Sequence, residues 1–396
     1  MAPAFEEQLH DNDLLGPSPK TPGKARVAIV TGTRAEFGLL RPVMTAIAAQ
    51  PRLELAVIAA GSHLLLPANT VREVKQAFRV GAVVPMQQPG KHTRIDDAEA
   101  LGRGIARFAR TFYKMNVDCV VVLGDRIEAF AAAAAASVGG VPLVHIHGGD
   151  RAEGVADEAM RHAITKLAHI HFPATRASAD RLARLGEPES SIHAVGSPAI
   201  DGLSAIAPDA ADLHDPELVI LQHPTGLSES DERAHAAAIA DAAAATKSRV
   251  LVLAPNHDPG RAAVLDVLQA AVQRHNWSFV EHLPRDRFVA LLKHLARING
   301  VLIGNSSAGL IEAAAIGCKV VNAGPRQSGR ESAANAIHVP HPTAAAISDA
   351  IAAHRSSGAC ETTHPYGDGQ AGPRIAAILA QIDFDDPALL RKRCTH

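Results

Sequence analysis

Titratable side chains gather in one segment of this 396-residue chain, residues 145–166, which reads HIHGGDRAEGVADEAMRHAITK. The segment follows an apolar run and carries histidines, carboxylates and an arginine in close succession: His147, Asp150, Glu153, Asp157, Glu158, Arg161 and His162. Side chains of these types can exchange protons and hold charged ligands. Two interpretations are open, a polar loop followed by a solvated helix face, or the mouth of an active site.

A further carboxylate, Asp125, ends the apolar run 118–125 and precedes an alanine-rich stretch. An aspartate in this place is often the N-cap of the following helix. It is equally a natural place for a general base, and the spacing does not decide between the two. His223 stands at the end of another apolar run, which begins at residue 217, and is followed by Pro224.

Two glycine-containing turns could hold an anion. Residues 32–38, GTRAEFG, follow an apolar run, and Arg34 could contact a diphosphate where the next helix begins. Residues 304–317 contain Ser306 and Ser307 ahead of a helix, and Glu312 could accept hydrogen bonds from ribose hydroxyls. The alternatives are a capped helix with a surface arginine, and a serine N-cap with an exposed glutamate. Downstream, Arg326 and Arg330 lie in a glycine-rich loop that suits an anion.

The sequence gives little sign of a metal or a dinucleotide cofactor. His145 and His147 are two residues apart on an expected strand, so with Asp150 a metal site is conceivable. The same His-Ile-His pattern recurs at 169–171 without a following acid, however, so we expect no metal. The turn at 32–38 is not GxGxxG, and the four cysteines form no CxxC pair. We therefore expect no cofactor.

Short apolar runs alternate with alanine-rich stretches from residue 26 onward, which is typical of buried parallel strands between helices. The expected strands are 26–32, 53–61, 118–125, 142–149, 170–174, 217–224, 249–255, 277–283, 300–306 and 319–324. This pattern predicts an α/β fold with two Rossmann-type, doubly wound parallel sheets. Because polar residues stand at the carboxyl ends of these strands, we expect both domains to face a central cleft there.

The expected organisation has four parts. Residues 1–24 are predicted to be a disordered tail, 25–200 an N-terminal domain with the catalytic residues, 201–372 a C-terminal domain that binds the nucleotide, and 373–396 a C-terminal helix that could pack back on the first domain. The net charge of −2 gives no electrostatic sign of nucleic acid or an anionic membrane. No apolar run approaches ~20 residues and no signal peptide is recognised, so a cytoplasmic location is expected.

Taken together, the motifs resemble those of the UDP-N-acetylglucosamine 2-epimerase family, most closely its hydrolysing branch. The matching segments, in chain order, are VTGTRAEFGLLRPVM, GSHL, GDRIEA, HIHGGD, DEAMRHAITKLAHIHF, VGSPAID, QHP, LPRDRFVALLKH, IGNSSAGLIEAAAIG and GPRQSGR. The resemblance implies the fold of GT-B glycosyltransferases and a homodimer. It also implies a UDP-sugar substrate, from which UDP is eliminated to give a glycal. Water then adds to the glycal and releases the free sugar, N-acetylmannosamine or its 2,4-diacetamido trideoxy analogue.

The resemblance also implies roles for particular residues. Asp125 matches the aspartate of the family's Gly-Asp-Arg motif, and Asp157 and Glu158 match an acidic pair ahead of Arg161 and His162. His223 matches a histidine near the diphosphate and is expected to be catalytic as well as to contact the substrate. The residues implied to contact the substrate are Arg34, Arg161, His162, His223, Ser306, Ser307 and Glu312, with Arg326 as a weaker match.

One position departs from the family pattern, because His147 stands where many members have a catalytic glutamate. Asp150, Glu153 or His147 itself could supply the missing acid–base group. A His-Gly-Gly sequence of this kind resembles the branch that acts on UDP-2,4-diacetamido-2,4,6-trideoxyglucose in legionaminic acid synthesis. A non-hydrolysing epimerase, a GT-B glycosyltransferase and a silent sugar-nucleotide binding protein are the remaining alternatives.

Overall fold

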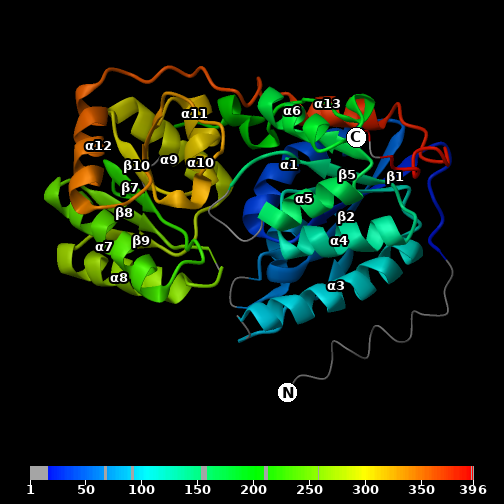
Figure 1. Ribbon diagram of the computed structural model, residues 1–396, viewed down its shortest axis with the longest axis horizontal. Coiled ribbons are helices and arrows are strands. Elements are labelled where there is room, and N and C mark those ends of the chain that lie inside the picture. Colours follow the sequence, from blue (N-terminus) through cyan, green and yellow to red (C-terminus); the bar gives the residue numbers. More distant parts are fainter. Residues whose placement is uncertain are drawn as a thin grey trace.

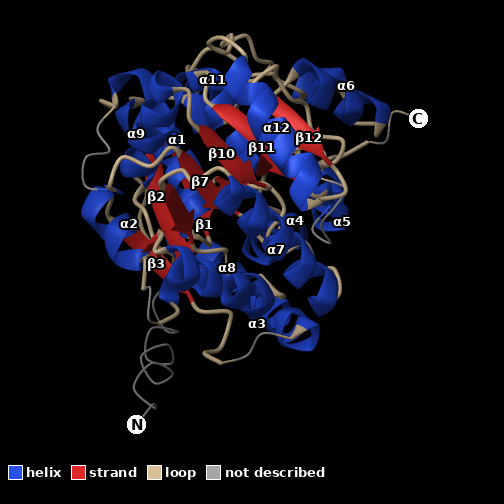
Figure 2. Ribbon diagram, turned by 90° about the vertical axis from the view of Figure 1, so that its left-hand side faces the viewer, coloured by secondary structure: helices blue, strands red, loops and turns tan. Residues whose placement is uncertain are grey.

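The fold is given by a computed structural model, which describes residues 17–66, 69–90, 93–152, 158–208, 213–256, 258–393 and 395. Its two parallel sheets occupy separate halves of the chain. Figure 1 shows the halves side by side, and Figure 2 shows helices on both faces of the strands. The predicted α/β class with two Rossmann-type sheets is confirmed.

The first sheet has the strand order β3-β2-β1-β4-β5-β6, with all neighbours parallel. The order reverses between β1 and β4, where the connections turn to opposite sides. The strands are β1 (Ala25–Thr31), β2 (Leu53–Ala60), β3 (Val80–Val84), β4 (Cys119–Leu123), β5 (Leu143–Ile146) and β6 (Ile170–Phe172).

The second sheet has the order β12-β11-β10-β7-β8-β9 and is also parallel throughout. Its order reverses between β7 and β10, so both sheets have the same topology. The strands are β7 (Leu218–Leu221), β8 (Val250–Leu253), β9 (Ser278–Val280), β10 (Val301–Gly304), β11 (Lys319–Ala323) and β12 (Ala336–Val339).

Helices cover both faces of each sheet. Those of the first half are α1 (Arg34–Ala49), α2 (Val71–Ala77), α3 (Arg94–Met115), α4 (Ile127–Val138), α5 (Glu158–Leu167) and α6 (Arg176–Arg184). Those of the second half are α7 (Glu229–Ala245), α8 (Arg261–His275), α9 (Arg285–Ile298), α10 (Ser307–Leu310), α11 (Glu312–Ile316) and α12 (Ala344–Ser356). Buried apolar side chains of α1 pack on one face of the first sheet, and those of α3 and α4 pack on the other. In the second sheet, α7, α8 and α12 pack opposite α9.

The last helix, α13 (Ala371–Leu379), lies on the first half of the molecule although it follows α12 of the second (Figure 1). Its residues Ile375 and Leu379 join Leu40 of α1 in one buried apolar cluster. The carboxylate of Asp201 accepts hydrogen bonds from the backbone N–H groups of Ala371 at 3.0 Å and Gly372 at 2.6 Å, which caps the start of α13. The described residues beyond α13 are turns and irregular structure.

The amino-terminal segment is described from residue 17. Its backbone is fastened to the first domain, because the Ser18 N–H donates to the Lys114 carbonyl at 2.8 Å and the Thr21 N–H to Glu54 at 3.1 Å. This part of the predicted tail is therefore held against the domain. Across the described ranges, no helix combines the length and the apolar character that a membrane crossing requires.

Two strands, β3 and β12, were not among those expected. Each forms the outer edge of its sheet, and most of its side chains are only partly buried. An edge strand packs against fewer neighbours, so its sequence carries a weaker apolar signal than a central strand. The strands in the middle of the sheets are continuous apolar runs, and these were expected from the sequence.

Candidate active site

The four central strands bring the predicted motifs to the points where strand order reverses. Arg34 follows β1 and Asp125 follows β4, while His223 follows β7 and Ser306 follows β10. Ligands of open parallel sheets bind beyond the carboxyl ends of the strands at such points. Each half of the chain therefore has two polar segments, one after each of its two central strands, at the place where a ligand would bind.

Asp125 and Glu158 share one buried guanidinium, that of Arg161 on α5. Arg161 is 3% exposed, whereas the side chains of Asp125 and Glu158 are each 20% exposed. Burial, together with the cations Arg330 and Arg181, lowers the pKa of Arg161 to about 9, so the guanidinium stays charged at neutral pH. Two partly exposed carboxylates are thus held by one buried guanidinium.

Other predicted residues lie around this cluster. His162 is at its margin, with its Nε2 3.5 Å from Glu158, and its side chain is 41% exposed. The backbone N–H of Ala152 donates to Glu158 at 3.0 Å. Glu153 and Asp157, both predicted catalytic residues, lie outside the described residues.

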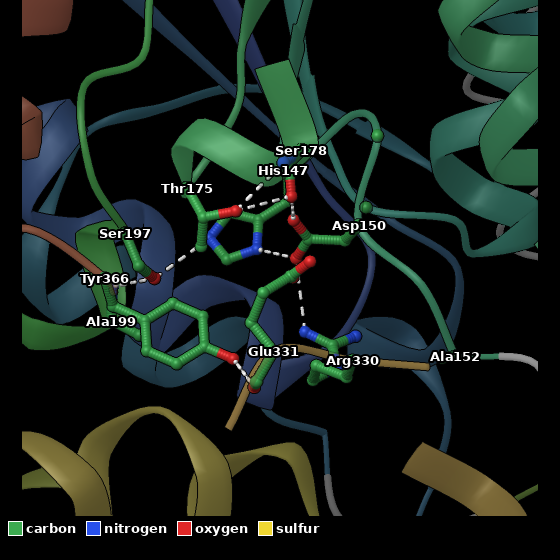
Figure 3. A network of polar contacts seen from close by, with 12 residues as sticks. His147, Asp150, Ala152, Thr175, Ser178, Ser197, Ala199, Arg330, Glu331 and Tyr366 are labelled. Carbon is green, nitrogen blue, oxygen red and sulfur yellow. Dashed lines mark hydrogen bonds and ion pairs between the residues drawn. The ribbon is translucent and has the colours of Figure 1, made fainter. Parts of the chain in front are cut away.

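His147 and Asp150 form the centre of a buried network (Figure 3). The φ angle of His147 is +64°, in the left-handed region that few side chains other than Asn, Asp and His adopt. Its Nδ1 lies 2.8 Å from an Asp150 oxygen, and its Nε2 lies 2.9 Å from the hydroxyl of Ser197. The other Asp150 oxygen accepts a hydrogen bond from Ser178 at 2.9 Å.

The second half of the chain completes this network. Arg330, in the loop between β11 and β12, donates to Asp150 at 3.1 Å, and Glu331 pairs with Arg181 of α6 at 2.6 Å. Burial alone would raise the pKa of Asp150, but His147, Arg330 and Ser178 together lower it to about 2. Asp150 is therefore an ionised and fully bonded carboxylate.

Arg34 presents an arrangement suited to an anion. Its Nε lies 2.9 Å from Glu73, whereas Nη1 and Nη2 are buried and have no hydrogen-bond partner within the described parts of the chain. Burial lowers the pKa of Arg34, because removing the guanidinium from water disfavours its charge. A buried donor without a partner is unfavourable by ~1–3 kcal/mol, which an anionic ligand would relieve.

His223 is held next to Asn305 by the close approach of β7 and β10. The φ of Gly304 is +143°, and a Cβ there would lie 2.0 Å from the Leu221 carbonyl oxygen, so no larger residue fits. The His223 N–H donates to the Asn305 side chain at 2.8 Å, and Asn305 donates back to the His223 carbonyl at 2.8 Å. Burial of the ring, helped by Arg326, lowers the pKa of His223 to about 3.

The protonation of the His223 ring follows from its partner. The backbone N–H of Asn256 donates to its Nδ1 at 3.1 Å, so this nitrogen is an acceptor and the proton of the neutral ring is on Nε2. Close by, Asp258 lies 3.2 Å from Arg126 of the first half and 3.9 Å from Arg326. His223 is therefore an uncharged N–H donor near Arg326 and Asp258.

The remaining predicted residues stand where α10 and α11 begin. The hydroxyl of Ser306 is the N-cap of α10 and accepts from the Ala308 N–H at 3.4 Å, and Ser307 is its first residue. Glu312 is the first residue of α11 and is buried, which raises its pKa. Arg326 donates to the Asn305 carbonyl at 3.3 Å, on the same side of the second sheet.

Two histidines of the His-Ile-His motifs, His145 and His171, make buried structural hydrogen bonds. His145 is fully buried, with Nε2 2.8 Å from the Gly124 carbonyl and Nδ1 3.1 Å from Thr165, and burial lowers its pKa to about 3. His171 pairs with Glu187 at 3.0 Å. In the portion of the chain that the structure describes, His, Cys, Asp and Glu nowhere gather in a group of three that could hold a metal ion.

Sequence reasoning missed several participants of the site: Ser178, Arg181, Ser197, Asp258 and Glu331. Ser197 was part of a matching motif but carried no expected role. Arg330 was noticed only as a cation in a glycine-rich loop, and the structure pairs it with Asp150. None of these residues directly follows an apolar run, so the sequence pattern around them did not indicate that they lie near His147.

Comparison with known proteins gives a consistent result. A model of the family described as UDP-N-acetylglucosamine 2-epimerase matches residues 45–380. A hydrolysing UDP-N,N'-diacetylbacillosamine 2-epimerase of Legionella pneumophila is 34% identical over 376 residues, 92% of this chain and 98% of the relative. A UDP-N-acetylglucosamine 2-epimerase of Neisseria meningitidis serogroup B is 30% identical over 354 residues, 87% of this chain and 91% of the relative.

Solved structures share the fold. A UDP-GlcNAc 2-epimerase from Neisseria meningitidis, bound to UDP-GlcNAc, has a TM-score of 0.74 at 18% identity and covers 90% of this chain and 100% of its own. One from Methanocaldococcus jannaschii, in complex with UDP-GlcNAc and UDP, has a TM-score of 0.75 at 17% identity, covering 89% and 99%. At these identities the likeness concerns the arrangement of the two sheets and their helices.

Proposed function

We propose that this chain, which belongs to the UDP-N-acetylglucosamine 2-epimerase family, is a hydrolysing epimerase that converts a UDP-2-acetamido sugar and water into UDP and the free sugar inverted at C2. The observation that carries this proposal is the pair of carboxylates, Asp125 and Glu158, held by the buried guanidinium of Arg161. Elimination and hydration each need a group that moves a proton at C2. Two partly exposed carboxylates, one after β4 and one at the start of α5, can serve both steps.

The reaction balances without a cofactor. In the first step the bond between C1 and the diphosphate oxygen breaks, a carboxylate takes the proton from C2, and a glycal with a C1–C2 double bond results. In the second step, water adds its hydroxyl to C1 while C2 receives a proton on the opposite face. We assign these proton transfers to Asp125 and Glu158, with Asp157 as a further candidate. Arg161 keeps the two described carboxylates in place.

The diphosphate would lie between the two halves of the chain. Two nitrogens of Arg34, which have no partner among the described residues, and the Nε2–H of His223 are donors that can hold its oxygens, and Arg326 adds positive charge. Since the pKa of His223 is about 3, the ring stays neutral at physiological pH and acts as a donor rather than an acid. In this proposal His223 binds the diphosphate, and the carboxylates transfer the protons.

Two sugars compete as the substrate. UDP-N-acetylglucosamine would give N-acetylmannosamine, and UDP-2,4-diacetamido-2,4,6-trideoxyglucose, which is UDP-N,N'-diacetylbacillosamine, would give the diacetamido analogue used for legionaminic acid. We favour the second, because the Legionella relative named for it is 34% identical over nearly its whole length. The replacement of the family's glutamate by His147 also supports this choice. We further propose a homodimer, as the resemblance implies.

The group that replaces that glutamate is not Asp150, in our proposal. Asp150 is 2% exposed and its two oxygens already accept from His147, Arg330 and Ser178, so it is a fixed anion and not a proton carrier. Both nitrogens of the His147 ring are engaged as well. We therefore propose that His147 shapes the loop 147–150. Glu153 lies outside the described residues and stays a candidate.

Product analysis tests the proposed function. The protein is incubated in D2O with each of the two UDP-sugars, and the products are identified by mass spectrometry and NMR. We expect free sugar and UDP, one deuterium at C2, and faster turnover of the diacetamido sugar. A mixture of two UDP-sugars would instead mean non-hydrolysing epimerisation, transfer to an added acceptor would mean a glycosyltransferase, and binding without turnover would mean a binding protein.

A second prediction concerns the nucleotide. If Glu312 accepts hydrogen bonds from the ribose, Glu312→Ala should weaken UDP binding by ~1–3 kcal/mol, the range for leaving a buried hydroxyl without its hydrogen-bond partner. Glu312→Gln keeps the shape and one acceptor and should weaken binding less. Calorimetry with UDP measures both variants, and unchanged affinity in Glu312→Ala would remove this residue from the site.

A further inference from the structure

The imidazole of His147 lies between a hydroxyl and a carboxylate, with Ser197 at Nε2 and Asp150 at Nδ1. Figure 3 shows the ring bridging these two side chains. His147 is 5% exposed, and Ser197 is 0% exposed. The order hydroxyl, imidazole, carboxylate is that of a catalytic triad, but here the hydroxyl is closed off from any substrate. Ser197 can therefore influence the reaction only through the groups that it contacts, and among these His147 belongs to the loop 147–150.

The donors and acceptors along this chain of contacts can be assigned. Asp150 is ionised and can only accept, so Nδ1 of His147 carries a proton and donates it. The Ser197 oxygen already accepts from the Ala199 N–H at 3.2 Å, as the N-cap of the short helix Pro198–Ile200. Its own proton can therefore be donated to Nε2 when the single ring proton is on Nδ1.

We propose that Ser197 is a positioning residue for His147, and that its hydroxyl holds the ring in the tautomer with the proton on Nδ1, facing Asp150. This inference deepens the proposed function, on which its kinetic part rests. The contact directs the ring towards Asp150, whose other donors include Arg330 from the second half of the chain. Ser197 thereby supports the contact between Arg330 and Asp150.

The backbone holds Ser197 firmly enough for this role. Its N–H donates to the Tyr366 carbonyl at 2.9 Å, in the segment that crosses between the two halves. The φ of Gly196 is +92°, and a Cβ there would lie 3.0 Å from the Tyr366 oxygen. The Tyr366 hydroxyl in turn donates to the Glu331 carbonyl, next to Arg330. The backbone contacts of Ser197 and Gly196 with Tyr366 thus fix the position of the Ser197 hydroxyl.

Nitrogen NMR tests the tautomer directly. In protein with 15N-labelled histidine, the signals of His147 are assigned by their loss in His147→Gln. We expect Nδ1 to be protonated and Nε2 to be an acceptor, and Ser197→Ala to change the Nε2 signal, because Nε2 loses its hydrogen-bond donor. The matched control is Ser178→Ala, which removes a hydroxyl from Asp150 but not from the ring, and should leave the pattern intact. A native ring protonated on Nε2, or an equal response of both variants, would overturn the proposal.

Kinetics provide the second arm. Ser197→Ala should lower kcat by about tenfold, the lower end of the range seen when a site residue loses the hydrogen bond that orients it. KM and the affinity for UDP should stay within about twofold of the native values. In a His147→Gln background the same change should alter kcat by less than about twofold, because the ring through which Ser197 acts is gone. Equal effects in both backgrounds would show a merely structural N-cap. Since NMR needs no substrate, it still tests the tautomer if neither UDP-sugar is turned over.

Discussion

Asp125→Asn should lower turnover by on the order of 10²-fold or more while leaving the fold and UDP binding intact, as expected for loss of a positioned acid–base group. Asparagine has nearly the same shape as aspartate, so the position after β4 remains filled. It lacks the negative charge that faces Arg161, and it cannot take a proton from C2. The loss should therefore be in kcat, with little change in the affinity for UDP, whose proposed contacts come from other segments.

Steady-state kinetics with the preferred UDP-sugar and calorimetry with UDP measure the two quantities. Asp286→Asn is the matched control, because it makes the same chemical change at a largely exposed carboxylate of α9 that pairs only loosely with Arg41 at 3.5 Å. Its turnover should equal that of the native protein. Near-native turnover of a folded Asp125→Asn protein would remove Asp125 from the proton transfers and leave Glu158 to be tested in its place.

The sequence predicted the larger features of the site because they depend on local pattern. Continuous apolar runs identify buried parallel strands, and the residues after them must lie at the carboxyl edge of a sheet. Arg34, Asp125, His223 and Ser306 all follow this rule, and they come after the central strands β1, β4, β7 and β10. The strength of the apolar signal at these strands made their ends identifiable.

The network around His147 could not be predicted in this way. Its contacts join residues far apart in the chain, such as His147 with Ser197 and Asp150 with Arg330. They also depend on the left-handed backbone of His147, which a sequence pattern does not reveal. The family resemblance identified the position as unusual, and only the three-dimensional arrangement shows that both ring nitrogens are engaged.

For Arg161, the sequence identified the motif in which it lies, but only the structure shows which residues it contacts. Its guanidinium pairs with Asp125 and Glu158 and also donates to the Asp150 carbonyl at 3.1 Å. It therefore ties both carboxylates to the loop of His147. Lysine cannot reproduce this, because one ammonium group lacks the fork of donors that reaches several acceptors at once.

Arg161→Met should accordingly be more damaging than Asp125→Asn. Removing one partner of a buried ion pair leaves an uncompensated charge, for which about 3–5 kcal/mol of lost stability is typical. The side chains of Asp125 and Glu158 are each 20% exposed, so water can screen them, and we expect about 2–3 kcal/mol. Turnover should fall by at least 10²-fold, because both proposed proton carriers lose their position.

Denaturant unfolding and kinetics at a temperature where the variant is folded separate these two effects. Arg161→Lys should recover part of the stability, since a positive charge returns, but little of the turnover, since the geometry does not. If Arg161→Lys restored both, a nearby positive charge would be enough and the bridging of two carboxylates would not matter. Native turnover in a folded Arg161→Met protein would contradict the carboxylate pair as the centre of the reaction, and with it the observation on which the proposed function rests.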